Sequence, residues 1–205
     1  MTDYVEPVRK HLKVNHPRKR IGLDTLTVTP PDDDGHVCMD VIVDLFSHHL
    51  QLYPRKSHEA EALAQNLYSY YMTWGIYDQI ITDPGSDIMS DAVTTLNKWL
   101  SVEHLVSLVG RHESNGVEGT NKQILRHLRT LVHDERNDQI KRKWGSPSVY
   151  KAVEFYINSF DHAEAGIIPL HARLGSDVLP YANILEHITK SSPDHTHDSM
   201  HNYVK

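Results

Sequence analysis

Residues 21–53, IGLDTLTVTPPDDDGHVCMDVIVDLFSHHLQLY, carry three β-strand patterns in succession. The first pattern, at residues 21–29, is rich in β-branched side chains and alternates along the chain, and the turn sequence PPDDDG follows it. The same kind of pattern returns at residues 37–45 and at residues 48–53. The segment therefore predicts three strands in meander order.

Two helices alternate with two further strands in the pattern of residues 57–109. Ser57 is a candidate N-cap for a helix that ends at Gly75, with an apolar stripe of Leu63, Leu67, Tyr70, Tyr71 and Trp74. A buried strand is predicted at residues 77–82, and another strand at residues 104–109. Between them, a helix from about Ser90 is expected to turn inward Val93, Leu96, Trp99 and Leu100.

The remainder of the chain is predicted to be mainly helical. One strongly periodic helix has Val117, Ile124, Leu128 and Leu131 on one face, and a second helix is predicted near residues 148–160. We expect a basic flexible arm at residues 1–18, a core domain at residues 19–180, and a short helix with a polar flexible tail at residues 181–205. The expected fold class is α/β, with a mixed five-stranded sheet flanked by helices.

Composition excludes several classes of protein. The chain of 205 residues is 39% hydrophobic and 23% charged, which is ordinary for a globular protein. Its single cysteine, Cys38, excludes an internal disulfide framework and an all-cysteine zinc site. The apolar runs are too short to span a bilayer, and the polar start lacks a signal-peptide core. The formal net charge of -6 means that any nucleic-acid binding must depend on local basic patches.

Three carboxylates stand at informative places in the predicted element order. Asp24 lies in the first strand, Asp83 ends the fourth, and Glu118 lies in the first turn of the helix after the fifth. If the first and fourth strands are neighbours, these acids can converge, and carboxylates that converge in a partly dry site need cations between them. The alternative is that they are three of the 27 acidic residues, most of which lie on solvated faces.

Short motifs surround each of these acids. Asp24 lies in IGLDTLTVTPP, Asp83 in TDPGSDI and Glu118 in ESNGVEGTNKQILRHLRTLV, with 34 residues between Asp83 and Glu118. The second and third strands read DVIVDLFSHHLQLYP, and NSFDHAEAGIIPLHARLG follows the acids. In this order and spacing, residues 18–178 resemble the integrase catalytic core of retroviruses and gypsy-like LTR retrotransposons, a family with an RNase H-like fold and a D,D,E triad.

The resemblance implies a function for the three acids. Asp24, Asp83 and Glu118 would be the catalytic residues and the ligands of two Mg²⁺ ions, with Mn²⁺ as a substitute. The expected activity is divalent-metal-dependent polynucleotidyl transfer, comprising DNA 3′-end processing and strand transfer, with retroelement terminal DNA and target DNA as partners. A homodimer or higher oligomer, no membrane partner, and a place in the nucleus or in a retroelement particle are also expected.

The resemblance also suggests DNA contacts. Asn121 and Lys122 follow Glu118 in the expected places, Arg126 and Arg129 extend the same helix, and His112 lies in the loop before it. Residues 18–20 and 141–143 are further possible phosphate contacts. For each of these side chains the alternative is simple solvent exposure.

The chain departs from the family pattern at two positions. Pro84 stands where asparagine is usual, and Gly119 stands where many gypsy-like sequences have arginine, which lowers helix propensity by ~1 kcal/mol. No segment resembles the family's flanking zinc-binding or carboxy-terminal domains, so we expect a core fragment or a decayed element. Two rival functions follow: a decayed or domesticated domain that binds nucleic acid or protein without catalysis, and another RNase H-like nuclease.

Other polar clusters are interpreted as structural. Asp32, Asp33 and Asp34 are contiguous, so they predict a turn rather than a calcium site. His195, His197 and His201 are expected in a disordered tail, and Asp44 is expected to support the second strand. Cys38 and the three tryptophans, Trp74, Trp99 and Trp144, are expected to be packing residues.

Overall fold

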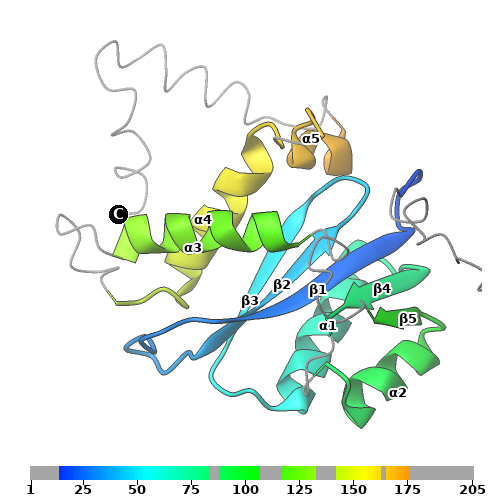
Figure 1. The fold of residues 1–205 in the computed structure, drawn as a ribbon, viewed down its shortest axis with the longest axis horizontal. Coiled ribbons are helices and arrows are strands. Elements are labelled where there is room, and N and C mark those ends of the chain that lie inside the picture. Colours follow the sequence, from blue (N-terminus) through cyan, green and yellow to red (C-terminus); the bar gives the residue numbers. More distant parts are fainter. Residues whose placement is uncertain (1–13, 84–87, 107–116, 133–141, 163–164, 176–205) are drawn as a thin grey trace, which may run out of the picture.

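A computed structural model describes residues 14–83, 88–106, 117–132, 142–162 and 165–175. These residues form a five-stranded mixed sheet with helices on both faces (Figure 1). This architecture confirms the predicted α/β fold class. The short helix and the histidine tail predicted within residues 181–205, the start of the basic arm and His112 lie outside the described residues.

The sheet combines an antiparallel meander with two parallel strands. Strands β1, β2 and β3 are the meander, and β4 runs parallel to β1 with β5 parallel beyond it, in the order β3-β2-β1-β4-β5. The bounds are Arg20–Thr27, Cys38–Asp44, Leu50–Arg55, Gln79–Thr82 and Glu103–Val106 for β1 to β5. The meander is as the sequence predicts, and the first and fourth strands are neighbours, which is the condition for Asp24 and Asp83 to converge.

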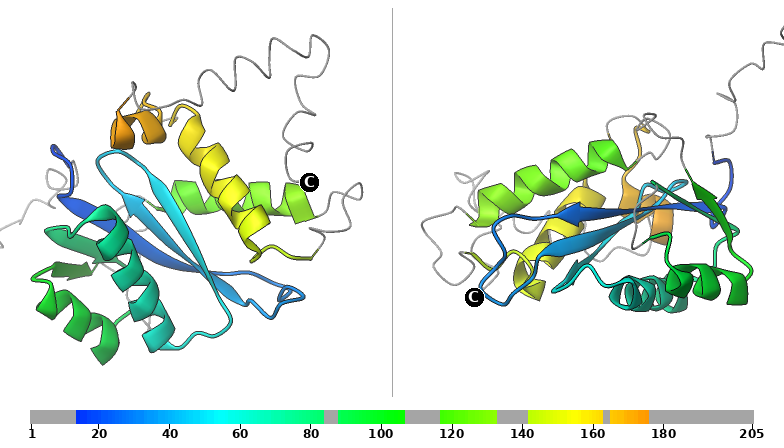
Figure 2. Two further views of the ribbon diagram at one scale, coloured as in Figure 1. Left: turned by 180° about the vertical axis from the view of Figure 1, so that it is seen from behind. Right: turned by 60° about the horizontal axis from the view of Figure 1, so that its bottom comes forward.

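Four helices cover the two faces of the sheet. Helices α1 (Ala60–Trp74) and α2 (Asp91–Trp99) lie on one face, and α3 (Glu118–Val132) and α4 (Pro147–Ser159) lie on the other (Figure 2). Strand β2 is buried along its whole length because it lies between both helical layers. None of the helices in the described ranges has both the length and the hydropathy for a bilayer crossing.

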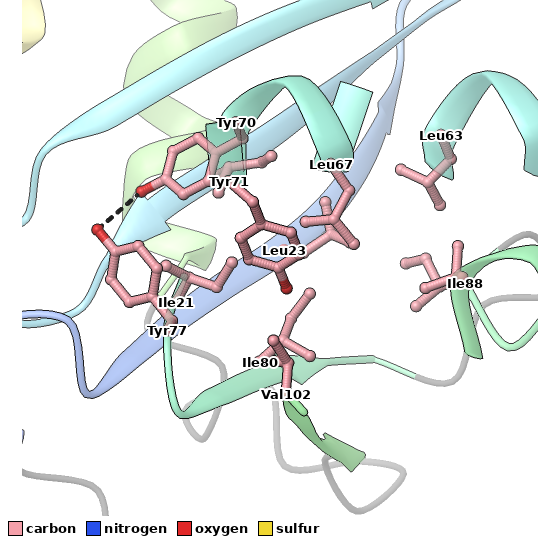
Figure 3. Close-up of a cluster of buried hydrophobic side chains, with 12 residues drawn as sticks. Ile21, Leu23, Leu63, Leu67, Tyr70, Tyr71, Tyr77, Ile80, Ile88 and Val102 are labelled. Carbon is pink, nitrogen blue, oxygen red and sulfur yellow. Dashed lines mark hydrogen bonds between the residues drawn. The ribbon is translucent and has the colours of Figure 1, made fainter. Parts of the chain in front are cut away.

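The face under α1 and α2 is packed by tyrosines and aliphatic side chains (Figure 3). Leu63, Leu67, Tyr70 and Tyr71 form the buried stripe of α1, as predicted from the sequence. Tyr70 donates a hydrogen bond of 3.2 Å to the hydroxyl of Tyr77, so the buried phenol is paired rather than orphaned. The stripe therefore fixes α1 against the sheet.

The opposite face is packed by α3 and α4. Val117, Ile124 and Leu128 of the α3 segment join Val149 and Val153 of α4 in one cluster with residues of β2 and β3. Trp144 belongs to the same cluster, which confirms its role as a packing residue, and its indole N–H donates to the Pro30 carbonyl at 3.2 Å. This packing fixes where the first turn of α3 lies over the sheet.

Helix α4 also covers the edge of the sheet. The Asn158 side chain accepts a hydrogen bond from the Leu50 amide and donates one to the Leu50 carbonyl, both at 2.8 Å. Glu154 accepts from the Leu52 amide at 2.9 Å. Because β3 is an edge strand, these contacts satisfy backbone groups that would otherwise be open to pairing with another chain.

The turn between β1 and β2 is organised by Asp32, as the turn prediction requires. Its carboxylate accepts hydrogen bonds from the backbone amides of Asp34 and His36 and from the His36 ring. It also accepts one from the Gly145 amide, which ties the turn to the segment before α4. Cys38 is fully buried in the core, as predicted.

Two predictions about the helices are wrong. Ser57 does not cap α1, which begins at Ala60 after Glu59. Trp99 is 82% exposed because Val93 and Asn97, spaced four residues apart, define the buried face of α2. The polar Asn97 side chain can be buried because the Tyr71 hydroxyl donates a hydrogen bond to its side-chain oxygen at 3.1 Å. Helix α5 (Pro169–Leu174) lies in the closing segment, for which the sequence predicts no particular element.

Helix α5 is held by Arg173, whose guanidinium lies at the end of the sheet. It donates to the Asp44 carboxylate at 2.6 Å, to the Tyr77 hydroxyl at 2.7 Å and to the Trp74 carbonyl at 2.9 Å. Arg173 is also within 5.1 Å of the Trp74 ring centroid. Asp44 therefore supports the structure, as predicted, through an ion pair with a residue 129 positions away.

His49 lies buried beside this arginine and should make stability depend on pH. Burial, together with the Arg173 charge and against the opposing effect of Asp44, lowers the pKa of the His49 imidazole from 6.5 to about 4. Between pH 6.5 and pH 4, His49 is therefore protonated in the unfolded chain but neutral in the folded chain. The stability that neutral His49 allows is complete above pH 6.5 and is lost as pH falls toward 4. We expect a loss of about 2 kcal/mol in the free energy of unfolding between pH 7.5 and pH 5.

The variant His49→Phe tests this expectation by urea unfolding at both pH values. Phenylalanine keeps a ring against Trp74, whose centroid lies 4.9 Å from that of His49, and removes the titrating group. The variant should lose about 2 kcal/mol less than the native chain over the same interval. An identical pH dependence in the two proteins would show that another group causes it.

Candidate catalytic centre

Asp24 lies in the middle of β1, on the face of the sheet that α3 and α4 cover. Ile21 and Leu23 pack in the cluster under α1, so strand alternation directs Asp24 to the other face. Asp24 is half-buried, and each of its carboxylate oxygens accepts a hydrogen bond. Oδ1 accepts from the Thr25 amide at 2.8 Å, and Oδ2 accepts from the Asn121 side-chain amide at 2.6 Å.

Asp83 lies immediately after β4, the parallel neighbour of β1. The register pairs Leu23 with Thr82, so the next position on each strand brings Asp24 beside Asp83. Neighbouring strands are separated by roughly 4.8 Å, so the two backbones hold these acids close together. Asp83 is half-buried and lies one residue after Thr82, the last residue of β4.

Glu118 is the first residue of α3, and the first turn of this helix lies against Asp24. The backbone amide of Asn121 donates to the Val117 carbonyl at 2.9 Å, while the side-chain amide of Asn121 donates to the Asp24 carboxylate. Val117 is fully buried, which fixes the start of the helix. The backbone of Glu118 thus lies one helical turn before a residue that touches Asp24, while its side chain lies outside the described part of the chain.

The donor set suits a hard divalent cation. Carboxylate oxygens are the ligands that Mg²⁺ prefers, and two half-buried aspartates side by side are stabilised by a cation between them. Among the side chains that the structure describes, no group of three or more potential metal ligands lies together. Since Glu118 is not among them, the described site comprises the two aspartates.

A polar cluster comprising Thr25, Asp40, Arg55 and Asn66 lies behind Asp24, on the α1 face of the sheet. The Arg55 side chain donates to Asp40 Oδ1 at 2.9 Å and to the Thr25 hydroxyl at 3.2 Å. Asn66 of α1 donates to Asp40 Oδ2 at 2.8 Å. Burial raises the pKa of Asp40, although the Arg55 charge opposes this effect. The cluster connects β1, β2, β3 and α1 next to Asp24.

The predicted DNA-contact residues that the structure describes lie on α3. Lys122, Arg126 and Arg129 are exposed along the helix, whereas Asn121 is half-buried. His112 lies outside the described residues. In the other basic segment at the start of the core, Lys19 pairs with Asp78 at 3.0 Å, and Arg20 donates to the Gln79 side chain at 2.9 Å. Lys122, Arg126 and Arg129 therefore form an exposed basic stripe along the helix whose first turn contacts Asp24 through Asn121.

Gly119 should limit the stability of α3. It is exposed in the first turn, and a methyl group built on it meets no atom within 4 Å. We expect Gly119→Ala to raise the free energy of unfolding by up to about 1 kcal/mol, because alanine loses less backbone entropy in a helix. Urea denaturation at constant pH measures the change.

A second glycine provides the control. Gly35 also has open space around it but adopts a φ of 86°, which side-chain-bearing residues rarely take. Gly35→Ala should therefore destabilise the chain by about 1 kcal/mol. If Gly119→Ala destabilised it as much, helix propensity would not be the limiting property at position 119.

Comparison with known proteins finds a retroelement relative. The chain is 22% identical over 125 residues to the retrovirus-related Pol polyprotein from transposon 412 of Drosophila melanogaster. The match covers 60% of this chain and 10% of the polyprotein, so the chain spans about a tenth of that relative's length. No protein-family model matches the chain.

Two solved structures with the same fold are retroviral. A chain in the cryo-EM structure of the simian T-cell lymphotropic virus intasome superimposes with a TM-score of 0.67 and 17% identity, covering 80% of this chain and 57% of that chain. The HTLV-2 integrase catalytic core domain, solved with magnesium in a trimeric form, gives a TM-score of 0.61 and 17% identity, covering 77% of this chain and 97% of that chain. The chain therefore has the RNase H-like fold of retroviral integrase catalytic cores and is related in sequence to a retroelement Pol polyprotein, as its motifs predict.

Proposed function

We propose that this chain is the divalent-metal-dependent polynucleotidyl transferase core of an LTR-retroelement integrase, which carries out DNA 3′-end processing and strand transfer. The observation that carries the proposal is the parallel register of β1 and β4, which pairs Leu23 with Thr82, the residues directly before Asp24 and Asp83. The retroviral integrase core with the same fold was solved in complex with magnesium, which supports the choice of metal. The retroelement relative supports the choice of DNA as substrate.

In this proposal, Asp24, Asp83 and Glu118 hold two Mg²⁺ ions, for which Mn²⁺ substitutes. Bound divalent cations would activate a water or a DNA 3′-hydroxyl and stabilise the charge on the leaving 3′-oxygen. The chain itself supplies carboxylates whose backbone positions are set by a parallel strand pair and by the packed start of α3. One site then serves both reactions, because only the attacking oxygen differs between them.

The exposed stripe of Lys122, Arg126 and Arg129 is proposed to contact DNA phosphates, together with His112, which precedes this helix in the sequence. These cations lie on the helix that begins at Glu118, so DNA bound along them would pass the acids. We also propose retroelement terminal DNA and target DNA as partners, with a homodimer or higher oligomer as the working form. The intasome and the trimeric integrase core among the structural neighbours support an assembled form. We propose the nucleus or a retroelement particle as its location.

A strand-transfer assay with a labelled double-stranded DNA end, in Mg²⁺ or Mn²⁺, tests the proposal. Joined products that disappear in the variant Asp83→Asn support the integrase function. Cut products without joining would instead indicate an RNase H-like nuclease. If neither joined nor cut products form but DNA or protein binding is retained, the chain is a decayed or domesticated binding domain. The departures from the family pattern at Pro84 and Gly119 are the reason to consider this alternative.

A further inference from the structure

The Asn121 side chain has one described polar partner, and that partner is Asp24. Its Nδ2 donates to Asp24 Oδ2 at 2.6 Å, a short hydrogen bond for an amide and a carboxylate. Its Oδ1 is buried and accepts no hydrogen bond from the described residues. The orientation of the amide is chemically determined, because an ionised carboxylate only accepts and the amide nitrogen must face it.

We propose that Asn121 is a positioning residue that holds the Asp24 carboxylate in the orientation in which it binds a divalent cation. This inference rests on the proposed function of the site. Asp24 Oδ1 is held from the strand by the Thr25 amide, and Oδ2 is held from the helix by Asn121. Each oxygen of a carboxylate has further acceptor capacity, so both hydrogen bonds leave lone pairs for a metal ion.

The position of Asn121 in α3 suits this role. The helix is anchored by the buried side chains of Val117 and Ile124, which lie four residues before and three residues after it. Asn121 itself is half-buried, in contrast to its exposed neighbours Lys122 and Gln123. A hydrogen-bond donor fixed in a packed helix restricts the rotation of the Asp24 side chain, so the entropy cost of ordering that side chain when a cation binds is smaller.

Asn121→Ala tests the inference, with Gln123→Ala as the matched control. Gln123 carries the same amide group on the same helix but is exposed. Binding of Mn²⁺ in the absence of DNA is measured by titration calorimetry, DNA affinity is measured in the absence of metal, and thermal unfolding checks the fold. We expect Asn121→Ala to weaken Mn²⁺ binding by about 10-fold or more, as loss of a hydrogen bond behind a metal ligand does. Gln123→Ala should leave Mn²⁺ binding unchanged, and neither variant should change DNA affinity more than about twofold.

Each other result has a definite meaning. Equal Mn²⁺ affinity of Asn121→Ala and the native chain overturns the inference and leaves the proposed function intact. Loss of DNA affinity with unchanged Mn²⁺ affinity overturns it as well, and makes Asn121 a DNA contact. Absence of Mn²⁺ binding by the native chain overturns the proposed function itself. If Asn121→Ala fails to fold, Asn121→Ser removes the amide with a small polar side chain and the same criteria apply.

Discussion

Asp24→Asn should reduce both 3′-end processing and strand transfer on the order of 10³-fold, which corresponds to about 4 kcal/mol of transition-state stabilisation. The amide is uncharged and binds a divalent cation far less well than a carboxylate. The fold should survive, because the new side chain keeps an oxygen for the Thr25 amide. Asn121 can turn its amide so that its Oδ1, which has no described partner, accepts from the new amide.

Rates of both reactions, measured on the same DNA end, check this expectation. The matched control is Asp34→Asn, which removes an exposed carboxylate in the turn between β1 and β2. The control should retain native rates, and the melting temperatures of both variants should stay within about 3 °C of the native value. If Asp24→Asn were as active as Asp34→Asn, Asp24 would have no catalytic part.

Arg55→Met should lower the free energy of unfolding by about 3–5 kcal/mol, the largest stability effect that we expect from one substitution. Arg55 and Asp40 pair at 2.8 Å with side chains only 2% and 0% exposed. Removing the guanidinium leaves Asp40 buried without its opposite charge, and the Thr25 and Glu59 oxygens lose a donor. Methionine fills most of the volume, so the loss reports on polar contacts rather than on a cavity.

Urea unfolding measures this loss, and the exposed pair of Lys19 and Asp78 provides the comparison. Their side chains are 35% and 61% exposed, so Lys19→Met should cost no more than about 1 kcal/mol. A cost for Arg55→Met below about 1 kcal/mol would mean that Asp40 is accommodated without its partner. The polar cluster behind Asp24 would then have no part in stabilising the strands.

The architecture was predictable because local patterns carry it. Alternation in residues 21–53 predicts the meander, and the helical stripe of Leu63, Leu67 and Tyr70 predicts α1 and its buried face. Placing Asp24 near Asp83 needed one further condition, that the first and fourth strands are neighbours, and the β1–β4 register meets it.

Contacts between distant residues could not be predicted in this way. The Arg173–Asp44 pair spans 129 positions, and nothing in either local pattern indicates the partner. Trp99 was placed inward by its apolarity, yet the hydrogen bond from Tyr71 makes Asn97 the better buried residue. The motif predicts that Asn121 contacts DNA, whereas its hydrogen bond with Asp24 depends on the position of α3 over the sheet, which no local pattern indicates.

The central claim is that Asp24, Asp83 and Glu118 bind divalent cations jointly. Titration calorimetry with Mn²⁺, in the absence of DNA, tests it on the native chain, on Asp24→Asn, Asp83→Asn and Glu118→Gln, and on the triple variant. Joint binding predicts saturable Mn²⁺ binding by the native chain and at least a tenfold weaker affinity in each single variant. The loss of Mn²⁺-binding free energy in the triple variant should be much smaller than the sum of the losses in the three single variants. Native-like Mn²⁺ affinity in all three single variants would contradict it.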